Sequence, residues 1–142
     1  MLMHIKIKKL SPELPNLHYA KPGDAGFDLY ARERTILEPG KQVAIPTGVA
    51  LEIPEGFVGL VWDKSGLSIR QGLKTLGGVV DAGYRGEVMV GIINLSDTPY
   101  TFEQGDRVAQ MLIQKVEQAT FIVVDELSST ERGETGFGSS GK

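Results

Sequence analysis

The apolar residues of this chain stand in short runs rich in valine and isoleucine, and glycine or proline separates most of these runs. β-Branched side chains favour extended backbone, while Gly and Pro favour turns, so this pattern predicts strands. Helical spacing of apolar residues nowhere persists for more than about three turns. We therefore predict an all-β protein, built as a distorted jelly roll or β-sandwich-like barrel. The predicted strands are 5–10, 27–30, 35–37, 42–46, 49–53, 57–62, 79–80, 88–93, 100–102, 107–113 and 120–124.

Two segments are candidates for helix. Residues 64–71 follow Asp63, which is a candidate cap for the first turn. Residues 107–110 could form a short helical turn, but the apolar residues of 107–113 are nearly continuous and favour a buried strand. We therefore expect a strand at 107–113.

The composition of the chain changes after Asp125, where polar residues and then glycine and serine dominate. This change predicts one β domain over 1–125 and a flexible C-terminal tail over 126–142. Arg132 and Phe137 stand among the glycines and serines of the tail, which a passive tail would not require. Their grouping is typical of a phosphate-binding loop with an aromatic lid.

Composition limits the chemistry that is available. The chain has 142 residues, no cysteine and only two histidines, His4 and His18, which lie far apart and give little support to a His-rich metal site or a Ser-His-Asp triad. Carboxylates and hydroxyls would therefore carry any catalysis. A net charge of −3 argues against a general nucleic-acid binder but leaves room for a small phosphorylated ligand. With no signal-peptide pattern and no long apolar run, we expect a cytoplasmic protein.

The segment 77–87 combines four glycines with an acidic residue, Asp81. Val79 and Val80 lead into Asp81, and residues 88–93 lead the chain away, so the pattern predicts a hairpin with a carboxylate at its mouth. Glycine permits a tight turn or the close approach of a flat ligand. A plain turn with solvated charge explains the same residues.

Four further motifs carry candidate chemistry, and each has a simpler structural explanation. Residues 24–29 place Asp28 on an apolar strand, or at a turn edge where it caps N–H groups. Residues 63–68 offer a hydroxyl, a glycine and a lysine to a phosphate, or simply begin a helix. Residues 105–110 either form a turn that leads into a core strand or provide a polar contact to a ligand. Residues 132–141 are either a disordered terminus or a lid.

Taken together and in this order, the five motifs resemble those of the trimeric deoxyuridine triphosphatases (dUTPases), enzymes that hydrolyse dUTP to dUMP and pyrophosphate. The resemblance covers nearly the whole chain, from residue 24 to residue 139. It implies a homotrimer of jelly-roll subunits, with each active site shared between subunits. It also implies that the reaction limits uracil in DNA and supplies dUMP for dTTP synthesis.

The resemblance assigns the chemistry and the base specificity to the segment around Asp81. Asp81 matches the catalytic carboxylate that deprotonates the water attacking the α-phosphorus. Tyr84 matches the aromatic residue that packs against deoxyribose and excludes a 2′-hydroxyl. Main-chain groups of Leu76, Gly78 and Val80 match those that read uracil.

The remaining motifs match the groups that hold the triphosphate. Lys64, Ser65, Gly66 and Gln110 correspond to phosphate-binding positions, and Asp28 to an acid that holds water molecules around Mg²⁺. The resemblance implies that Mg²⁺ binds mainly to phosphate oxygens and water.

The fifth motif matches a lid that closes over the substrate. Arg132 corresponds to the residue that pairs with the γ-phosphate. Ser139 and Ser140 correspond to groups that donate to the same phosphate, Gly138 to a further substrate-binding position, and Phe137 to the ring over uracil.

The chain departs from the family pattern at two places. Asp63-Lys64 stands where many members have proline and arginine, so a flexible ammonium replaces a bidentate guanidinium. Thr75 stands where many bacterial members have an asparagine that supports uracil, so more of the recognition would fall to the backbone.

Two alternatives to a dUTPase remain open. A dCTP deaminase, or a deaminase that also hydrolyses dUTP, has the same fold; Tyr84 close after Asp81 and the complete C-terminal motif favour the hydrolase. A non-catalytic nucleotide-binding module is the other alternative, and an intact Asp81 argues against it.

Overall fold

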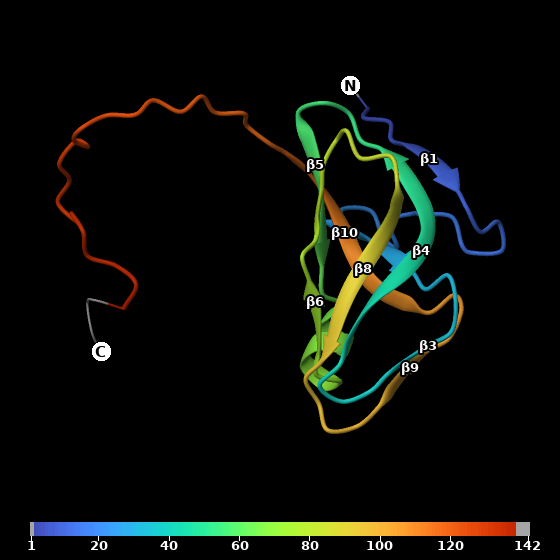
Figure 1. Ribbon diagram of the computed structural model, residues 1–142. Coiled ribbons are helices and arrows are strands. Elements are labelled where there is room, and N and C mark those ends of the chain that lie inside the picture. Colours follow the sequence, from blue (N-terminus) through green and yellow to red (C-terminus); the bar gives the residue numbers. More distant parts are fainter. Residues whose placement is uncertain (1, 139–142) are drawn as a thin grey trace.

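The computed structural model describes residues 2–138, which fold into two antiparallel sheets packed face to face and a separate two-stranded ribbon (Figure 1). The first sheet has the order β1 (Lys6–Lys9), β4 (Gln42–Glu52), β8 (Glu87–Asn94) and β6 (Leu73–Leu76). The second has the order β2 (Gly26–Tyr30), β10 (Arg107–Lys115), β5 (Phe57–Trp62) and β7 (Val79–Val80). The ribbon pairs β3 (Thr35–Leu37) with β9 (Tyr100–Phe102). The all-β jelly-roll prediction is confirmed.

Alternation of apolar and polar residues places the core between the two sheets. In β8, Val88, Val90 and Ile92 are almost fully buried, whereas Met89 between them is exposed. Successive side chains of a strand point to opposite faces, so one face of β8 packs inward and the other faces solvent. Burial of these apolar surfaces is the main stabilising term of the fold.

Several predicted elements differ in the structure. Segments 42–46 and 49–53 form one strand, β4, whose pairing with β8 shifts register between Pro46 and Ala50. The irregularity lets the proline stay inside a strand. The helical segment is shorter than predicted: it is η1 (Gly66–Arg70), a π-helix. The helical turn considered for 107–110 is wrong, because these residues belong to β10.

The predicted hairpin around Asp81 is also wrong. The strand before this residue, β7, pairs with β5 in the second sheet, whereas β8 after it pairs with β4 and β6 in the first. The chain therefore crosses from one sheet to the other at 81–86. Strand β6, which the sequence pattern did not predict, is the neighbour that β8 has instead of β7.

Residues after β10 leave the body of the protein (Figure 1). The predicted strand 120–124 does not form in this chain, although its side chains are apolar. Phe121, Ile122 and Val123 are 94%, 82% and 99% exposed. Among the described residues, no helix is long and apolar enough to cross a membrane.

Candidate active site

Neighbouring strands of the second sheet bring two of the motif residues side by side. Gln110 on β10 lies opposite Asp28 on β2 and, on its other side, opposite Trp62 on β5. Phe27 and Leu29 point into the core, so Asp28 between them points to the other face of the sheet. The register of three strands thus aligns the first and fourth motifs with the end of β5, where the second motif begins.

Asp28 is the centre of a charge cluster on this face. Its carboxylate accepts the ammonium of Lys64, with 2.5 Å between Oδ1 and Nζ, and the guanidinium of Arg107, with 3.0 Å between Oδ2 and Nε. The Asp28 side chain is only 16% exposed, so two opposite charges offset the cost of keeping it ionised there. Both carboxylate oxygens are therefore engaged by cations.

Gln110 links the first motif to the chain just before Lys64. Its Nε2 donates to the carbonyl oxygen of Asp63 at 2.9 Å. The amide lies over Gly26, where a Cβ atom would stand 2.5 Å from Oε1 of Gln110. Any larger residue at position 26 would push the amide away, which explains a glycine inside this strand.

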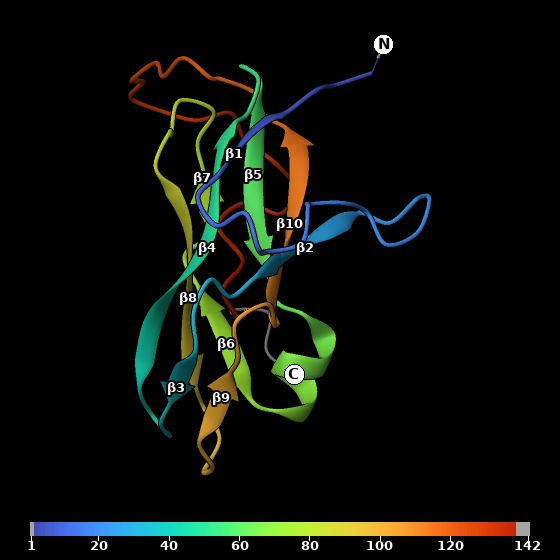
Figure 2. The same cartoon turned by 90° about the vertical axis from the view of Figure 1, so that its right-hand side faces the viewer.

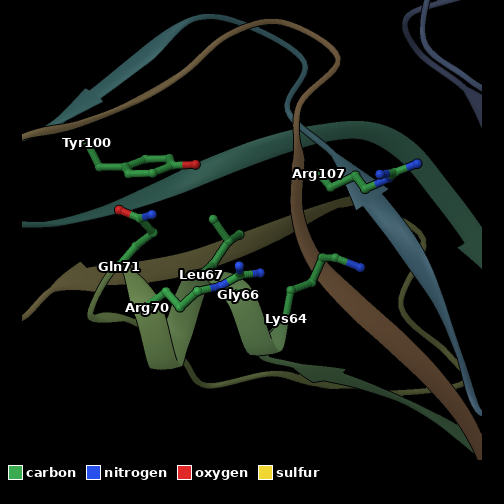
Figure 3. A pocket seen from close by; sticks show the side chains of 7 residues that line it. All are labelled: Lys64, Gly66, Leu67, Arg70, Gln71, Tyr100 and Arg107. Atoms are coloured by element: carbon green, nitrogen blue, oxygen red, sulfur yellow. The ribbon is translucent and has the colours of Figure 1, made fainter.

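A pocket of about 390 Å³ opens between η1 and the ends of β9 and β10 (Figure 3). Three of its side chains are cationic, so it suits an anionic ligand. Partial burial, and next the charge of Asp106, raise the pKa of Tyr100, so its hydroxyl ionises even less readily than that of an ordinary tyrosine. The lining residues are Lys64, Gly66, Leu67, Arg70, Gln71, Tyr100 and Arg107.

Ser65 stands at the start of η1 and is exposed. Its side chain makes no capping hydrogen bond to the helix, and within 2–138 its hydroxyl has no other hydrogen-bond partner. The hydroxyl of Ser65 and the backbone at Gly66 are thus accessible beside the cationic pocket. The assignment of Lys64, Ser65 and Gly66 to phosphate binding stays a prediction.

Asp63 does not cap the helix. Its Oδ1 accepts the main-chain N–H of Thr75 at 2.7 Å, and its Oδ2 accepts Nζ of Lys74 at 2.6 Å. Partial burial raises the pKa of Asp63, but the hydrogen bonds from Lys74 and Thr75 outweigh it and hold the pKa below its usual value. Asp63 therefore connects the segment before the pocket to strand β6.

The segment after β6 is a tight turn held against β5. Gly77 and Gly78 have φ of +75° and +140°, which L side chains rarely adopt. The carbonyl of Gly78 accepts the N–H of Val61 at 2.8 Å, and a Cβ atom on Gly78 would lie 2.8 Å from Cβ of Val61. Val80 then pairs with Gly59. Main-chain atoms of Leu76, Gly78 and Val80 thus occupy one fixed turn.

Asp81 follows this turn and is exposed. Its carbonyl accepts the N–H of Tyr84 at 3.1 Å, but its carboxylate has no hydrogen-bond or ion-pair partner in the described part of the chain. The Tyr84 hydroxyl donates to the carbonyl of Glu87 at 2.8 Å, and the ring lies directly over Gly86. The Asp81 carboxylate is thus available to a ligand, and the Tyr84 ring is fixed against Gly86 in the same connection.

One chain does not bring Asp81 to the pocket. The connection from β7 to β8 lies at one end of the sandwich and η1 at the other, in both views (Figures 1 and 2). Within a single chain, the Asp81 carboxylate and the cationic pocket are therefore two separate parts of the candidate site.

The tail motif is also apart from both of these parts. Arg132 donates from Nε to the carbonyl of Thr135 at 2.8 Å, and the Thr135 hydroxyl donates back to the carbonyl of Arg132 at 2.8 Å. Phe137 is fully exposed and, like Gly138, has positive φ. Ser139 and Ser140 lie outside the described residues.

These features define a class: jelly-roll proteins with a cationic pocket at a short helix and a carboxylate on a glycine-rich turn. A family model described as dUTPase matches residues 13–141. The chain belongs to the dUTPase family.

Individual relatives agree over almost the full length. The deoxyuridine 5′-triphosphate nucleotidohydrolase of Thermobifida fusca (strain YX) is 46% identical over 142 residues, covering 98% of this chain and 79% of that protein. The enzyme of the same name from Mycolicibacterium gilvum (strain PYR-GCK) is 47% identical over 149 residues, covering 99% and 97%.

Solved structures show the same fold. A mutant of the Staphylococcus bacteriophage 80alpha dUTPase with dUpNHpp matches with a TM-score of 0.91 and 32% identity, over 98% of this chain and 99% of that one. A mutant dUTPase of phage phi11 of S. aureus, in which the coordination of a structural Mg(II) ion was described, matches with a TM-score of 0.81 and 29% identity, over 87% and 98%.

Sequence reasoning missed four polar residues of the site: Arg70, Lys74, Tyr100 and Arg107. Arg107 lies inside the fourth motif, so its position next to Gln110 was a usable signal. Arg70 lies one helical turn beyond Gly66, which was a second signal. The parts played by Lys74 and Tyr100 depend on strand pairing and could not be predicted from spacing.

Proposed function

We propose that this protein hydrolyses dUTP to dUMP and pyrophosphate. The observation that carries the proposal is Asp81, a carboxylate without a partner in the described chain, at the end of a turn fixed to β5 by Gly78. A free carboxylate beside a rigid main-chain recognition surface suits a general base that must act on one bound water. Membership of the dUTPase family supports the same reaction.

In the proposed mechanism Asp81 accepts a proton from a water molecule as the water oxygen attacks the α-phosphorus. A bond forms between this oxygen and phosphorus, and the bond from phosphorus to the oxygen bridging the α- and β-phosphates breaks. Pyrophosphate leaves with the bridging oxygen and its bonding electrons. Dissociation of the products returns the proton of Asp81 to solvent.

The turn at 76–80 would select the base. Main-chain N–H and C=O groups there have fixed positions, because Gly78 bonds to Val61 and Val80 pairs with Gly59. Cytosine presents donor and acceptor groups opposite to those of uracil and would leave buried backbone groups unpaired, which costs about 1–3 kcal/mol for each group. The Tyr84 ring would exclude a 2′-hydroxyl by contact.

The triphosphate would bind at the pocket beside η1. Ser65 is exposed there and Gly66 lines the pocket, next to the positive charges of Lys64 and Arg107. Gln110 holds the preceding carbonyl of Asp63 and would contact the phosphates or their water molecules. Phosphate oxygens suit such a mixture of fixed donors and cations.

We further propose a homotrimer in which each site combines residues of different subunits. The separation of the Asp81 turn from η1 supports this arrangement, because one chain alone does not assemble the site. The exposed apolar side chains of Phe121, Ile122 and Val123 support it as well, since contiguous exposed apolar surface is typical of interaction sites. The tail from Arg132 to Phe137 would close over the site as a lid.

Mg²⁺ is the metal ion that we propose for the reaction. Both oxygens of Asp28 are paired with Lys64 and Arg107, and the described residues contain no group of three or more His, Cys, Asp or Glu side chains that could hold a metal. The donor set therefore fits an ion held mainly by phosphates and water, with Asp28 acting through water. When bound, the ion would neutralise charge on the leaving pyrophosphate.

The experiment that tests the function is a pyrophosphate-release assay with dUTP, dCTP, dTTP and UTP, with and without Mg²⁺. We expect release from dUTP alone, and only with the metal present. Deaminated product from dCTP would favour a deaminase, and nucleotide binding without turnover would favour a non-catalytic module. Because the chain has no cysteine and its proposed substrate is a metabolic nucleotide, we place the reaction in the cytoplasm.

A further inference from the structure

Arg70 is a cationic residue of the pocket to which the five motifs assign no part. It is the last residue of η1, and its side chain runs back along the helix toward Gly66 (Figure 3). A Cβ atom built on Gly66 would lie 3.0 Å from Nη2 of Arg70. The guanidinium therefore rests against the glycine that marks the phosphate-binding segment.

The three cations of the pocket are not equivalent. Lys64 and Arg107 extend to the same side, where Asp28 pairs with both (Figure 3). Arg70 makes no ion pair and no side-chain hydrogen bond to any residue within 2–138. Its five N–H donors are thus available to a ligand, whereas part of the donor capacity of Lys64 is already used.

A guanidinium and an ammonium also differ in what they can hold. The planar guanidinium donates two parallel hydrogen bonds to a phosphate, whereas an ammonium acts as a point charge. The position directly before Ser65 has an ammonium, Lys64, which is already paired with Asp28. Within this part of the pocket, Arg70 is the side chain that can supply a bidentate contact beside Gly66.

We propose that Arg70 binds the triphosphate of the substrate directly, as the guanidinium partner of the Ser65-Gly66 segment. This inference rests on the proposed function. In it, Lys64 and Arg107 hold Asp28 and set the charge of the pocket floor. Arg70 is the side chain that donates hydrogen bonds to the phosphate.

The test compares wild-type protein with Arg70→Met and Arg70→Lys. Methionine keeps most of the aliphatic part of the side chain and the helix propensity but removes the donors. Lysine keeps the charge but lacks the planar guanidinium that donates two parallel hydrogen bonds. We expect Arg70→Met to weaken binding of dUpNHpp, measured by calorimetry, about tenfold or more, as loss of a charge-assisted hydrogen bond would. Arg70→Lys should recover only part of this affinity. Deoxyuridine, which has no phosphate, should compete equally well with all three proteins.

A second set of variants separates contact with phosphate from support of the helix. Lys64→Arg combined with Arg70→Met should regain part of the lost affinity, because a guanidinium returns to the same pocket. Arg34→Met is the matched control, since Arg34 is exposed, pairs with Glu103 and does not line the pocket. It should bind dUpNHpp as the wild type does.

The outcomes distinguish failure of this inference from failure of the proposed dUTP hydrolysis on which it rests. If wild-type protein releases pyrophosphate from dUTP while Arg70→Met binds dUpNHpp unchanged, Arg70 does not contact the triphosphate. Equal loss of deoxyuridine affinity would also overturn the inference, because it would indicate a structural effect. If the wild type releases no pyrophosphate from dUTP, the proposed function fails first. Should Arg70→Met not fold, the loss measured for Arg70→Lys decides.

Discussion

The carboxylate of Asp63 accepts the main-chain N–H of Thr75, with 2.7 Å between Oδ1 and N. Strand β6 is at the edge of the first sheet, where it pairs with β8 alone. Its outer N–H at Thr75 is therefore satisfied by a side chain from the end of β5, in the other sheet. Through this contact the segment that leads into the cationic pocket also positions strand β6, which leads into the turn at 76–80.

Replacing Asp63 should destabilise the protein and disturb the site. Asp63→Ala removes the acceptor for a partly buried N–H and should cost about 1–3 kcal/mol in the free energy of unfolding, measured by urea titration. Asp63→Asn keeps an acceptor for Thr75 but loses the charge that pairs with Lys74, so it should cost less. Asp97→Asn, at an exposed position, is the control.

The pH dependence of this contribution follows from the direction of the pKa shift. The pKa of Asp63 is lowered in the folded protein from a usual value of 3.8. Its stabilising effect should therefore be complete above that value and disappear as the pH falls through the lower, folded value. The difference between wild type and Asp63→Asn should persist at pH 5 and shrink below pH ~3.8. A difference that already vanishes near neutral pH would contradict the assignment.

Asp81→Asn should separate chemistry from binding. Asparagine has nearly the same shape but cannot accept the proton of the attacking water, so turnover of dUTP should fall by about 10²–10⁴-fold. Calorimetric affinity for dUpNHpp should change little. Near-normal turnover would show that Asp81 is not the base.

Tyr84 should set the preference for deoxyribose. Tyr84→Ala removes the ring and should lower the ratio of kcat/KM for dUTP to that for UTP. Tyr84→Phe loses only the hydrogen bond to the carbonyl of Glu87 and should keep most of the selectivity. An unchanged ratio in the alanine variant would mean that the sugar is sensed elsewhere.

Gly78→Ala should damage both stability and base recognition. The φ of +140° disfavours an L side chain, and the new Cβ atom would stand 2.8 Å from Cβ of Val61. We expect a lower midpoint of thermal unfolding and weaker dUpNHpp binding. Gly83→Ala is the control for stability, because a Cβ atom there would meet nothing within 4 Å. Equal unfolding midpoints for the two variants would argue against a constrained turn.

Removal of residues 132–142 should leave a folded oligomer with little activity. Arg132 and Thr135 hydrogen-bond to each other, and the chain after β10 leaves the body of the protein, so we expect the sandwich to fold without the tail. Analytical ultracentrifugation and the pyrophosphate assay would measure the two properties. A truncated protein with full activity would exclude a lid.

Much of the fold was predictable because it depends on local pattern. Strands such as β5 and β9 have the predicted bounds, since β-branched and aromatic residues are bounded by turn residues. Strand β6 was not predictable, because the polar Lys74 and Thr75 are held there by Asp63, far away in sequence. The hairpin prediction failed for a related reason: the partners of β7 and β8 lie elsewhere in the chain.

The candidate site followed the same division. The second motif singled out the consecutive residues Lys64, Ser65 and Gly66. In the structure, Lys64 and Gly66 line the cationic pocket. Spacing could not show that Asp28 would already pair with Lys64 and Arg107, since that depends on the register of β2 against β10. The assignment of Asp28 to water around Mg²⁺ stays a prediction.

The turn between β6 and β7 is also the point at which the chain passes from the first sheet to the second. Inside the core the two sheets meet through apolar side chains, whose hydrophobic attraction has no direction. A nucleotide bound to main-chain groups of this turn would form directional hydrogen bonds at the connection between the two sheets. Binding of uracil at this turn would then depend on the relative position of the two sheets, and a sandwich whose sheets were misaligned could not bind uracil.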